Sequence, residues 1–65
     1  MITINGEQKP LGNGRSIADV LEENGYGGKL VAVARNGEFV PRTLHANTNL
    51  EVGDELEIVA PMQGG

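Results

Sequence analysis

Apolar and polar residues alternate near both ends of the chain, which is typical of strands that bury one face. Ile2 and Ile4 are flanked by polar residues at the start, and Leu56 and Ile58 alternate with glutamates close to the end. Asn5-Gly6 follows the first run and accepts the positive φ angles of a tight hairpin turn. The pattern therefore predicts an opening pair of antiparallel strands and a half-buried strand near the end of the sequence.

One helix is predicted after the opening hairpin. Ser16 is a favourable N-cap, and Asp19 places a negative charge in the first turn, where the helix dipole favours it. Gly25 is positioned to end the helix in a left-handed conformation. The apolar stripe, at the i, i+3, i+4 spacing of an amphipathic helix, is formed by Ile17, Val20 and Leu21.

A second hairpin is predicted in the stretch KLVAVARNGEFVPR. Val31 and Val33 should face one side of the sheet and Ala32 and Ala34 the other, because successive strand residues point in opposite directions. Asn36-Gly37 provides another hairpin turn. The stretch TLHANTN that follows is interpreted as a polar loop before the last strand.

The predicted order is strand, strand, helix, strand, short strand, strand. This order indicates an α+β fold, with a mixed sheet of four to five strands and one helix packed across one face. Pro10 marks the second strand as an edge strand, because proline cannot donate to a strand ladder. The expected core consists of Ile2, Ile4, Leu11, Ile17, Val20, Leu21, Val31, Val33, Phe39, Val40, Leu50, Val52, Leu56 and Ile58.

The length of 65 residues fits one domain, and the absence of cysteine excludes a disulfide framework and a thiolate metal site. We expect residues 1–61 to form this domain and residues 62–65 a flexible tail. No apolar run approaches membrane-spanning length, and the first residues lack the basic region followed by an apolar region that marks a signal peptide. A cytoplasmic protein without a membrane partner is therefore expected.

The charges are unevenly distributed. Residues 1–43 carry equal numbers of acids and bases, so the net charge of −4 arises entirely after residue 43. The four acids responsible are Glu51, Asp54, Glu55 and Glu57. Nucleic acid is therefore a poor partner, because phosphate binding needs a basic patch, whereas a protein with a basic groove is a suitable one.

No side chain has the sequence context of a catalytic group. His45 has no nearby residues at metal-ligand spacing and is expected to be a solvated loop residue, so neither a metal site nor a bound cofactor is predicted. The carboxylates fall at positions where neither burial nor a fixed partner is implied. The remaining reactive group is the α-carboxylate of Gly65, which is ionised at neutral pH. Because Gly64 and Gly65 lack Cβ atoms, the segment from Met62 through Gln63 to the end could thread a narrow channel.

These features together resemble the ThiS family of sulfur carriers, in the ubiquitin-like β-grasp superfamily. The resemblance rests on ING in the opening hairpin, SIADVLEE as the helix, VAVARNGEFVPR, and LEVGDELEIVAPMQGG at the end. Two positions depart from the family pattern. Arg35 stands where an apolar strand residue is usual, and Leu44-His45 stands where an aromatic residue is common.

The resemblance implies a carrier protein and not an enzyme. In such proteins an adenylating enzyme related to the ubiquitin activators (ThiF) uses Mg-ATP to convert the terminal carboxylate, here Gly65, into an acyl-adenylate. A cysteine-derived persulfide then supplies sulfur, and the resulting thiocarboxylate is used by thiazole synthase (ThiG) in thiamin biosynthesis. We expect these partners to contact the sheet face opposite the helix, with Ala32, Ala34 and Val59 rimmed by Glu55 and Glu57.

Two alternatives remain open at this point. The first is the small subunit of molybdopterin synthase, which has the same fold and sulfur chemistry but a different acceptor and is usually longer than 65 residues. The second is a non-covalent β-grasp module with a regulatory or RNA-associated role, for which the two final glycines would be incidental.

Overall fold

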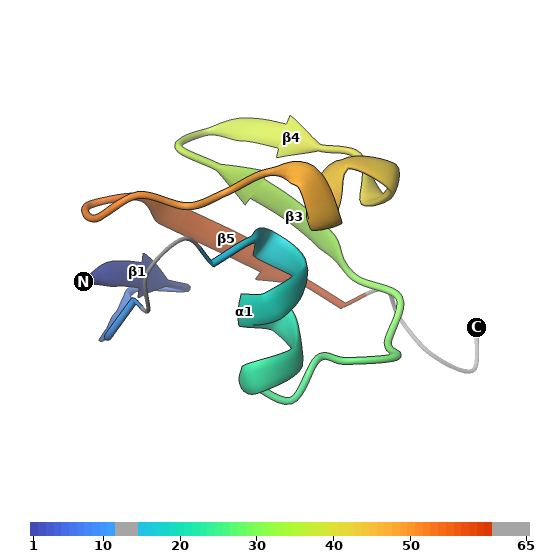
Figure 1. The fold of residues 1–65 in the computed structure, drawn as a ribbon, viewed down its shortest axis with the longest axis horizontal. Helices are drawn as coiled ribbons and strands as arrows, with labels where there is room; N and C mark the ends of the chain where they lie inside the picture. The colour runs from blue at the N-terminus through green and yellow to red at the C-terminus, as the bar shows by residue number, and fades with distance from the viewer. Residues whose placement is uncertain (12–14, 61–65) are drawn as a thin grey trace.

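The computed structural model describes residues 1–11 and 15–60, and within them the chain forms one mixed sheet with a helix against one face. The strands are β1 (Ile2–Ile4), β2 (Glu7–Lys9), β3 (Ala32–Arg35), β4 (Glu38–Val40) and β5 (Glu55–Val59). Their order in the sheet is β2-β1-β5-β3-β4, with β5 in the centre (Figure 1). β1 and β5 run parallel, and the other neighbours are antiparallel. The predicted α+β fold is confirmed, and β2 is an edge strand as expected.

Helix α1 (Ile17–Glu23) begins and ends where the sequence predicts. The backbone N–H of Asp19 donates to Oγ of Ser16, and the Asp19 carboxylate accepts from the Ser16 N–H, so the two residues form a capping box. At the other end, the Tyr26 N–H donates to the Leu21 carbonyl across Gly25, whose φ is +87°. This is the hydrogen-bond pattern of a Schellman motif, which favours glycine at that position.

Both predicted hairpin turns are present. Asn5 and Asn36 have φ angles of +50° and +51°, and a glycine with positive φ follows each of them. Two consecutive residues with positive φ are the mark of a type I′ turn, whose twist matches that of the flanking strands.

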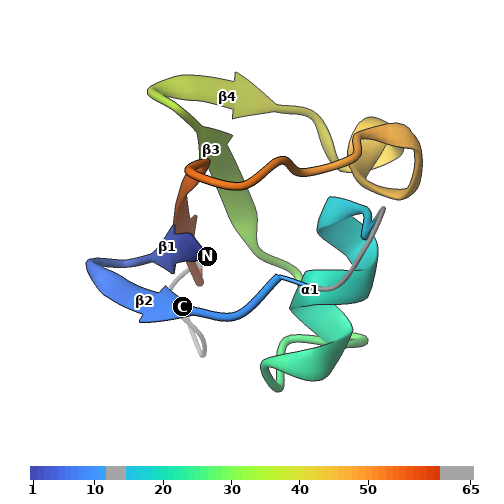
Figure 2. The ribbon, with the colours of Figure 1, turned by 60° about the vertical axis from the view of Figure 1, so that its left-hand side comes forward.

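The stretch interpreted as a polar loop is instead a short 3-10 helix, η1 (Arg42–Asn47). Pro41 precedes it in an extended conformation, and the Leu44 N–H donates to the Pro41 carbonyl. η1 and α1 lie on the same side of the sheet (Figure 2). The prediction of a loop was wrong because this short turn of helix is stabilised by packing beside α1, which local residue preference does not reveal.

The core lies between α1 and the inner face of the sheet. Its buried apolar residues are Ile2, Ile4, Ile17, Val20, Leu21, Val31, Val33, Leu50, Leu56 and Ile58. Leu11 and Val40 are partly buried against it. Two of the expected core residues are exposed instead: Phe39 at 67% and Val52 at 77%. Phe39 lies beside Val40 in a strand, so only one of the two can face inward, and Val52 lies at the tip of the turn before β5.

Candidate functional site on the central strand

The central strand β5 leads directly to the residues that the sequence marks as reactive. Ala60 is the last residue that the structure describes, one position beyond the end of β5. The predicted attachment site at Gly65 and the threading residues Met62, Gln63 and Gly64 lie outside the described residues. The described residues nearest to this segment are those of β5 and the residues that hold it.

Asn5 fixes β5 from one side. The Ile58 N–H donates to Oδ1 of Asn5 at 2.8 Å, and Nδ2 of Asn5 donates to the Ile58 carbonyl at 3.1 Å. The parallel pairing of β1 with β5 ends at Ile4 and Leu56. The Asn5 side chain thus continues the ladder by acting as a further strand residue. It binds the backbone two residues before Ala60.

Asn36 holds the beginning of β5 from the other side. The Glu55 N–H donates to Oδ1 of Asn36 at 2.9 Å, and the Asn36 N–H donates to the Glu55 carbonyl at 2.8 Å. Both turn asparagines therefore bind backbone groups of the central strand. The sequence signal that predicted the turns did not reveal this second use of their side chains.

Asp54 is buried at the start of β5, with 7% of its surface exposed. Its carboxylate accepts from Nε of Arg35 at 2.9 Å, from Nδ2 of Asn36 at 3.0 Å and from the Glu51 N–H at 2.8 Å. Burial alone would raise the pKa of Asp54, but the Glu51, Asn36 and Arg35 donors together outweigh burial and hold that pKa below its ordinary value.

The expectation that the carboxylates lack burial and fixed partners is therefore wrong for Asp54. The guanidinium of Arg35 forms an ion pair with this buried carboxylate. A single sequence gives no signal for a pair 19 residues apart.

The outer face of the sheet, opposite α1, contains all five residues predicted for partner contact. Val59 lies opposite Ala32 in the register, and Glu57 lies opposite Ala34. Val59 is 63% exposed, and Glu55 and Glu57 are exposed on the same strand. One detail differs from the prediction: Glu55 and Glu57 both lie on the central strand and not on an edge strand, because β5 has neighbours on both sides.

Phe39 belongs to this outer face and was missed as a surface residue. It lies opposite Ala34 in the pairing of β3 with β4, so Glu57, Ala34 and Phe39 form one row across three strands. The signal was present in the sequence, since two neighbouring strand residues cannot both point into the core. We define the outer-face patch as Ala32, Ala34, Phe39 and Val59, with Glu55 and Glu57 beside it.

His45 is buried, with 6% of its surface exposed, and is not the solvated residue that the sequence suggested. Its Nε2 lies 3.1 Å from the Val40 carbonyl. Because a carbonyl only accepts, Nε2 must carry the proton of this hydrogen bond. The contact anchors η1 to the end of β4, which is a structural role.

The part of the chain that the structure describes contains no group of three or more His, Cys, Asp or Glu residues that could hold a metal ion. Within the same residues, no helix has the length and apolar character needed to cross a membrane.

Comparison with known proteins is consistent with this geometry. The profile described as the ThiS family matches residues 2–65. A sulfur carrier protein ThiS from Thermus thermophilus is 43% identical over 65 residues, covering 100% of both chains. A thiazole synthase from Paramagnetospirillum magneticum is 39% identical over 64 residues, and there the chain spans 20% of the relative's length.

A solved structure gives the same result for the fold. The crystal structure of the thiamine biosynthesis protein ThiS from Geobacter metallireducens superposes with a TM-score of 0.82 at 25% identity. The match covers 98% of this chain and 97% of that one. The chain belongs to the ThiS family, as shown by the family profile, by the relative that aligns over its full length and by the ubiquitin-like fold.

Proposed function

We propose that this chain is a sulfur carrier of thiamin biosynthesis, with the α-carboxylate of Gly65 as the site of sulfur attachment. The observation that carries the proposal is the alignment with the sulfur carrier ThiS from Thermus thermophilus, which leaves no part of either chain unmatched. The chain itself supplies a folded head and a reactive terminus, and the bond-forming steps belong to partner enzymes.

The chemistry requires activation because a carboxylate is a poor electrophile. An adenylating enzyme of the ThiF type, using Mg-ATP, joins the Gly65 carboxylate to AMP and releases pyrophosphate. The terminal sulfur of a cysteine persulfide attacks the acyl carbon, and AMP leaves. A second thiol then cleaves the sulfur–sulfur bond, and a thiocarboxylate remains in place of the carboxylate.

Thiazole synthase is the proposed acceptor of this sulfur. The support is the thiazole synthase from Paramagnetospirillum magneticum, which contains a segment similar to nearly the whole of this chain within a longer protein. A carrier and its acceptor enzyme joined in one chain meet at a high effective concentration. Where a carrier and its acceptor are not joined in one chain, their meeting requires a docking surface.

The outer-face patch is the proposed surface for the activating enzyme. It combines small apolar side chains with one exposed aromatic residue, Phe39, and has exposed acids at Glu55 and Glu57. A partner with apolar contacts and nearby basic groups would complement it. The patch includes Val59, one residue before Ala60, so docking there would bring the partner close to the base of the tail.

The test is intact-mass spectrometry of the full chain after incubation with its activating enzyme, Mg-ATP and a persulfide source. We expect the mass gain that corresponds to one oxygen exchanged for one sulfur. Deleting Gly65, or changing Gly64→Trp, should abolish this gain while the circular dichroism spectrum stays that of the wild type. A wild-type chain that gains no sulfur from a competent activating enzyme would refute the proposal. Activity that survives loss of Gly64 and Gly65 would favour a non-covalent module instead.

A further inference from the structure

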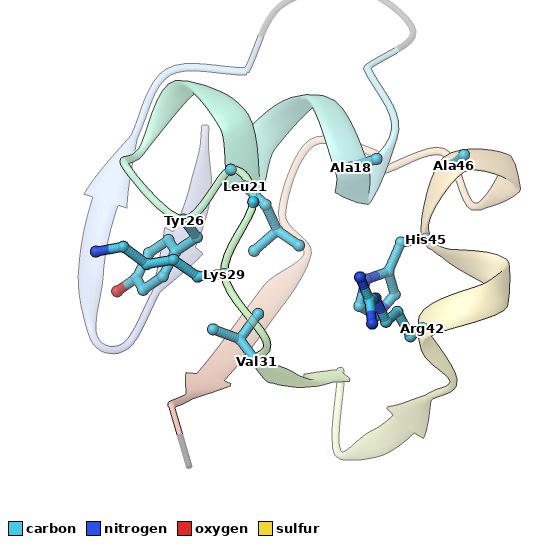
Figure 3. Close-up of a pocket in the computed structure, with 10 residues that line it drawn as sticks. Ala18, Leu21, Tyr26, Lys29, Val31, Arg42, His45 and Ala46 are labelled. Atoms are coloured by element: carbon cyan, nitrogen blue, oxygen red, sulfur yellow. The ribbon is translucent and has the colours of Figure 1, made fainter. Parts of the chain in front are cut away.

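A pocket of about 210 Å³ opens on the helix side of the molecule, away from the outer-face patch (Figure 3). It lies between α1, the segment 26–31 and η1. Leu21 and Val31 form its middle, with Tyr26 and Lys29 on one side and Arg42 and His45 on the other. The pocket therefore has an apolar floor and a cationic side chain at each rim.

Lys29 and Arg42, the lysine and the arginine at this pocket, form no ion pair among the described residues. The chain has five lysines and arginines, and all five lie within residues 1–11 and 15–60. Lys9 pairs with Glu7, Arg15 with Glu23, and Arg35 with Asp54. Lys29 and Arg42 have no such partner in that part of the chain, and both line the pocket.

One acidic side chain approaches this region. The carboxylate of Glu22 occupies the space that a Cβ at Gly27 would need, next to the rim formed by Tyr26 and Lys29. It does not line the pocket. The rim that contains Arg42 is built on η1, which His45 anchors through its hydrogen bond to the Val40 carbonyl. Arg42 is therefore held by a fixed element while its own side chain stays exposed.

We propose that this pocket is a second docking surface, which accepts an acidic segment of a partner protein. Its volume is smaller than the roughly 300–1,000 Å³ of a typical small-molecule site, so it suits one or two protein side chains better than a nucleotide. A glutamate could lay its methylenes over Leu21 and Val31 and bring its carboxylate to Arg42, whose planar guanidinium favours paired hydrogen bonds to carboxylates. Lys29, on a flexible stem, provides a second cation for a neighbouring acid.

The partner that fits best is the acceptor, thiazole synthase, and to that extent the inference rests on the proposed function. A carrier that stays close to its acceptor while the activating enzyme modifies its terminus needs two separate surfaces. Figure 2 shows α1 and η1 on the same side of the sheet. The outer-face patch faces away from α1, whereas the pocket is lined by residues of α1, the segment 26–31 and η1. Their charges are also opposite, with glutamates on one and unpaired cations on the other.

The first experiment measures binding of the full chain to the thiazole synthase of the same organism. Lys29→Glu and Arg42→Glu should each weaken the complex about tenfold or more, with the larger effect at low ionic strength. Lys9→Glu is the matched control, because it makes the same change in charge on the edge strand β2 and should leave the affinity unchanged. Wild-type affinity for both pocket variants would overturn the proposal.

The second experiment identifies the chemistry of the partner group. A carbodiimide links lysine amines directly to carboxylates that touch them, so treating the complex should join Lys29 to an Asp or Glu of the synthase. Arg42→Lys keeps the charge and adds an amine, and it should create a new cross-link at position 42. The proposal would be contradicted if the complex forms but cross-links appear only at Lys9. It would also be contradicted if the complex forms and no cross-link appears at position 29 or 42.

Two further measurements separate this inference from its alternatives. Saturable binding of inorganic phosphate alone, followed through the Arg42 side-chain resonance, would identify a small-anion site and overturn the protein-docking proposal. The sulfur-dependent mass gain, measured on the pocket variants with the activating enzyme alone, should match that of the wild type. If the wild type itself gains no sulfur, the proposed function has failed, whereas sulfur loading with unaltered synthase binding in the variants refutes only the pocket.

Discussion

At the scale of single residues, Asp54 holds the beginning of the central strand β5. It is a buried carboxylate with donors from Arg35, Asn36 and the Glu51 backbone, so it ties the β3–β4 turn to the beginning of β5. Burying a charge is costly unless it is fully paired and hydrogen-bonded. Here three donors meet that requirement, and the pKa of Asp54 is lowered because they stabilise its charged form.

A pH dependence of stability follows from the lowered pKa of Asp54. A group with a pKa lower in the folded state stabilises the fold above its unfolded pKa, and this contribution is lost as the pH falls through the folded pKa. We therefore expect the free energy of unfolding to be steady near neutral pH and to fall below about pH 4, the ordinary range of an aspartate. Urea unfolding measured between pH 7 and pH 2.5 checks this.

Asp54→Asn should reduce that acid-dependent loss and lower the free energy of unfolding at pH 7 by about 1–3 kcal/mol, because Arg35 would lose its charged partner. Glu38→Gln, at an exposed position on β4, is the control and should change stability by less than about 0.5 kcal/mol. If the free energy of unfolding of Asp54→Asn falls at acid pH as much as that of the wild type, the acid dependence arises from other carboxylates.

At the scale of elements, β5 is stabilised by the two hairpin turns beside it as well as by its neighbouring strands. Asn5 binds Ile58 on the β1 side, and Asn36 binds Glu55 on the β3 side. Each asparagine is also the first of the two central residues of a type I′ turn, where a positive φ is required. One residue type thus fixes both the turn and the position of the strand that leads to the tail.

Asn5→Gly should separate these two roles, because glycine accepts the positive φ but has no side chain to bind Ile58. We expect the free energy of unfolding to fall by about 1–3 kcal/mol, as two hydrogen bonds are lost. Amide hydrogen exchange should become faster at Ile58 in particular. Asn36→Gly is the matched variant, and there the faster exchange should appear at Glu55 and not at Ile58. Equal acceleration at both amides in both variants would indicate general loosening of the sheet.

At the scale of the whole molecule, the sheet divides the surface into two regions of different chemistry. The outer face has the apolar patch with Glu55 and Glu57, and the helix side has the pocket with Lys29 and Arg42. Opposite charges on opposite faces allow two partners to be distinguished by complementary fields. This arrangement fits the proposed function, in which one enzyme modifies the carrier and another uses it.

The proposed docking of an activating enzyme on the outer-face patch predicts that the association rate depends on charge. Glu57→Lys should slow association on the order of tenfold at low ionic strength and less at high salt, because complementary fields accelerate the encounter. Glu51→Lys makes the same charge change away from the patch and should have a smaller effect. Phe39→Ala should raise the dissociation rate without changing stability, since Phe39 is exposed. An association rate insensitive to Glu57→Lys at low salt would remove the patch from the interface.

Much of the fold could be predicted from local patterns. The Asn-Gly turns, the capping of α1 by Ser16 and the alternation in β5 each depend on residues close together in sequence, so a single chain reveals them. The prediction that Phe39 is a core residue was wrong because side chains alternate along β4, so that Phe39 faces outward when Val40 faces the core. The burial of His45 could not be predicted in that way, because it depends on how η1 packs beside α1.

The sequence by itself determined the strands, helix α1 and their order, because these follow from near-neighbour preferences, whereas it did not predict η1. Only the tertiary structure decided which charges are paired. Asp54 differs from the exposed acids through its contacts with Arg35 and Asn36, which are distant from it in sequence, whereas Lys29 and Arg42 have no ion pair among the described residues. The same long-range packing placed two asparagine side chains on the central strand. The physical reason is that backbone propensity acts over a few residues, whereas burial and charge pairing depend on the assembled fold.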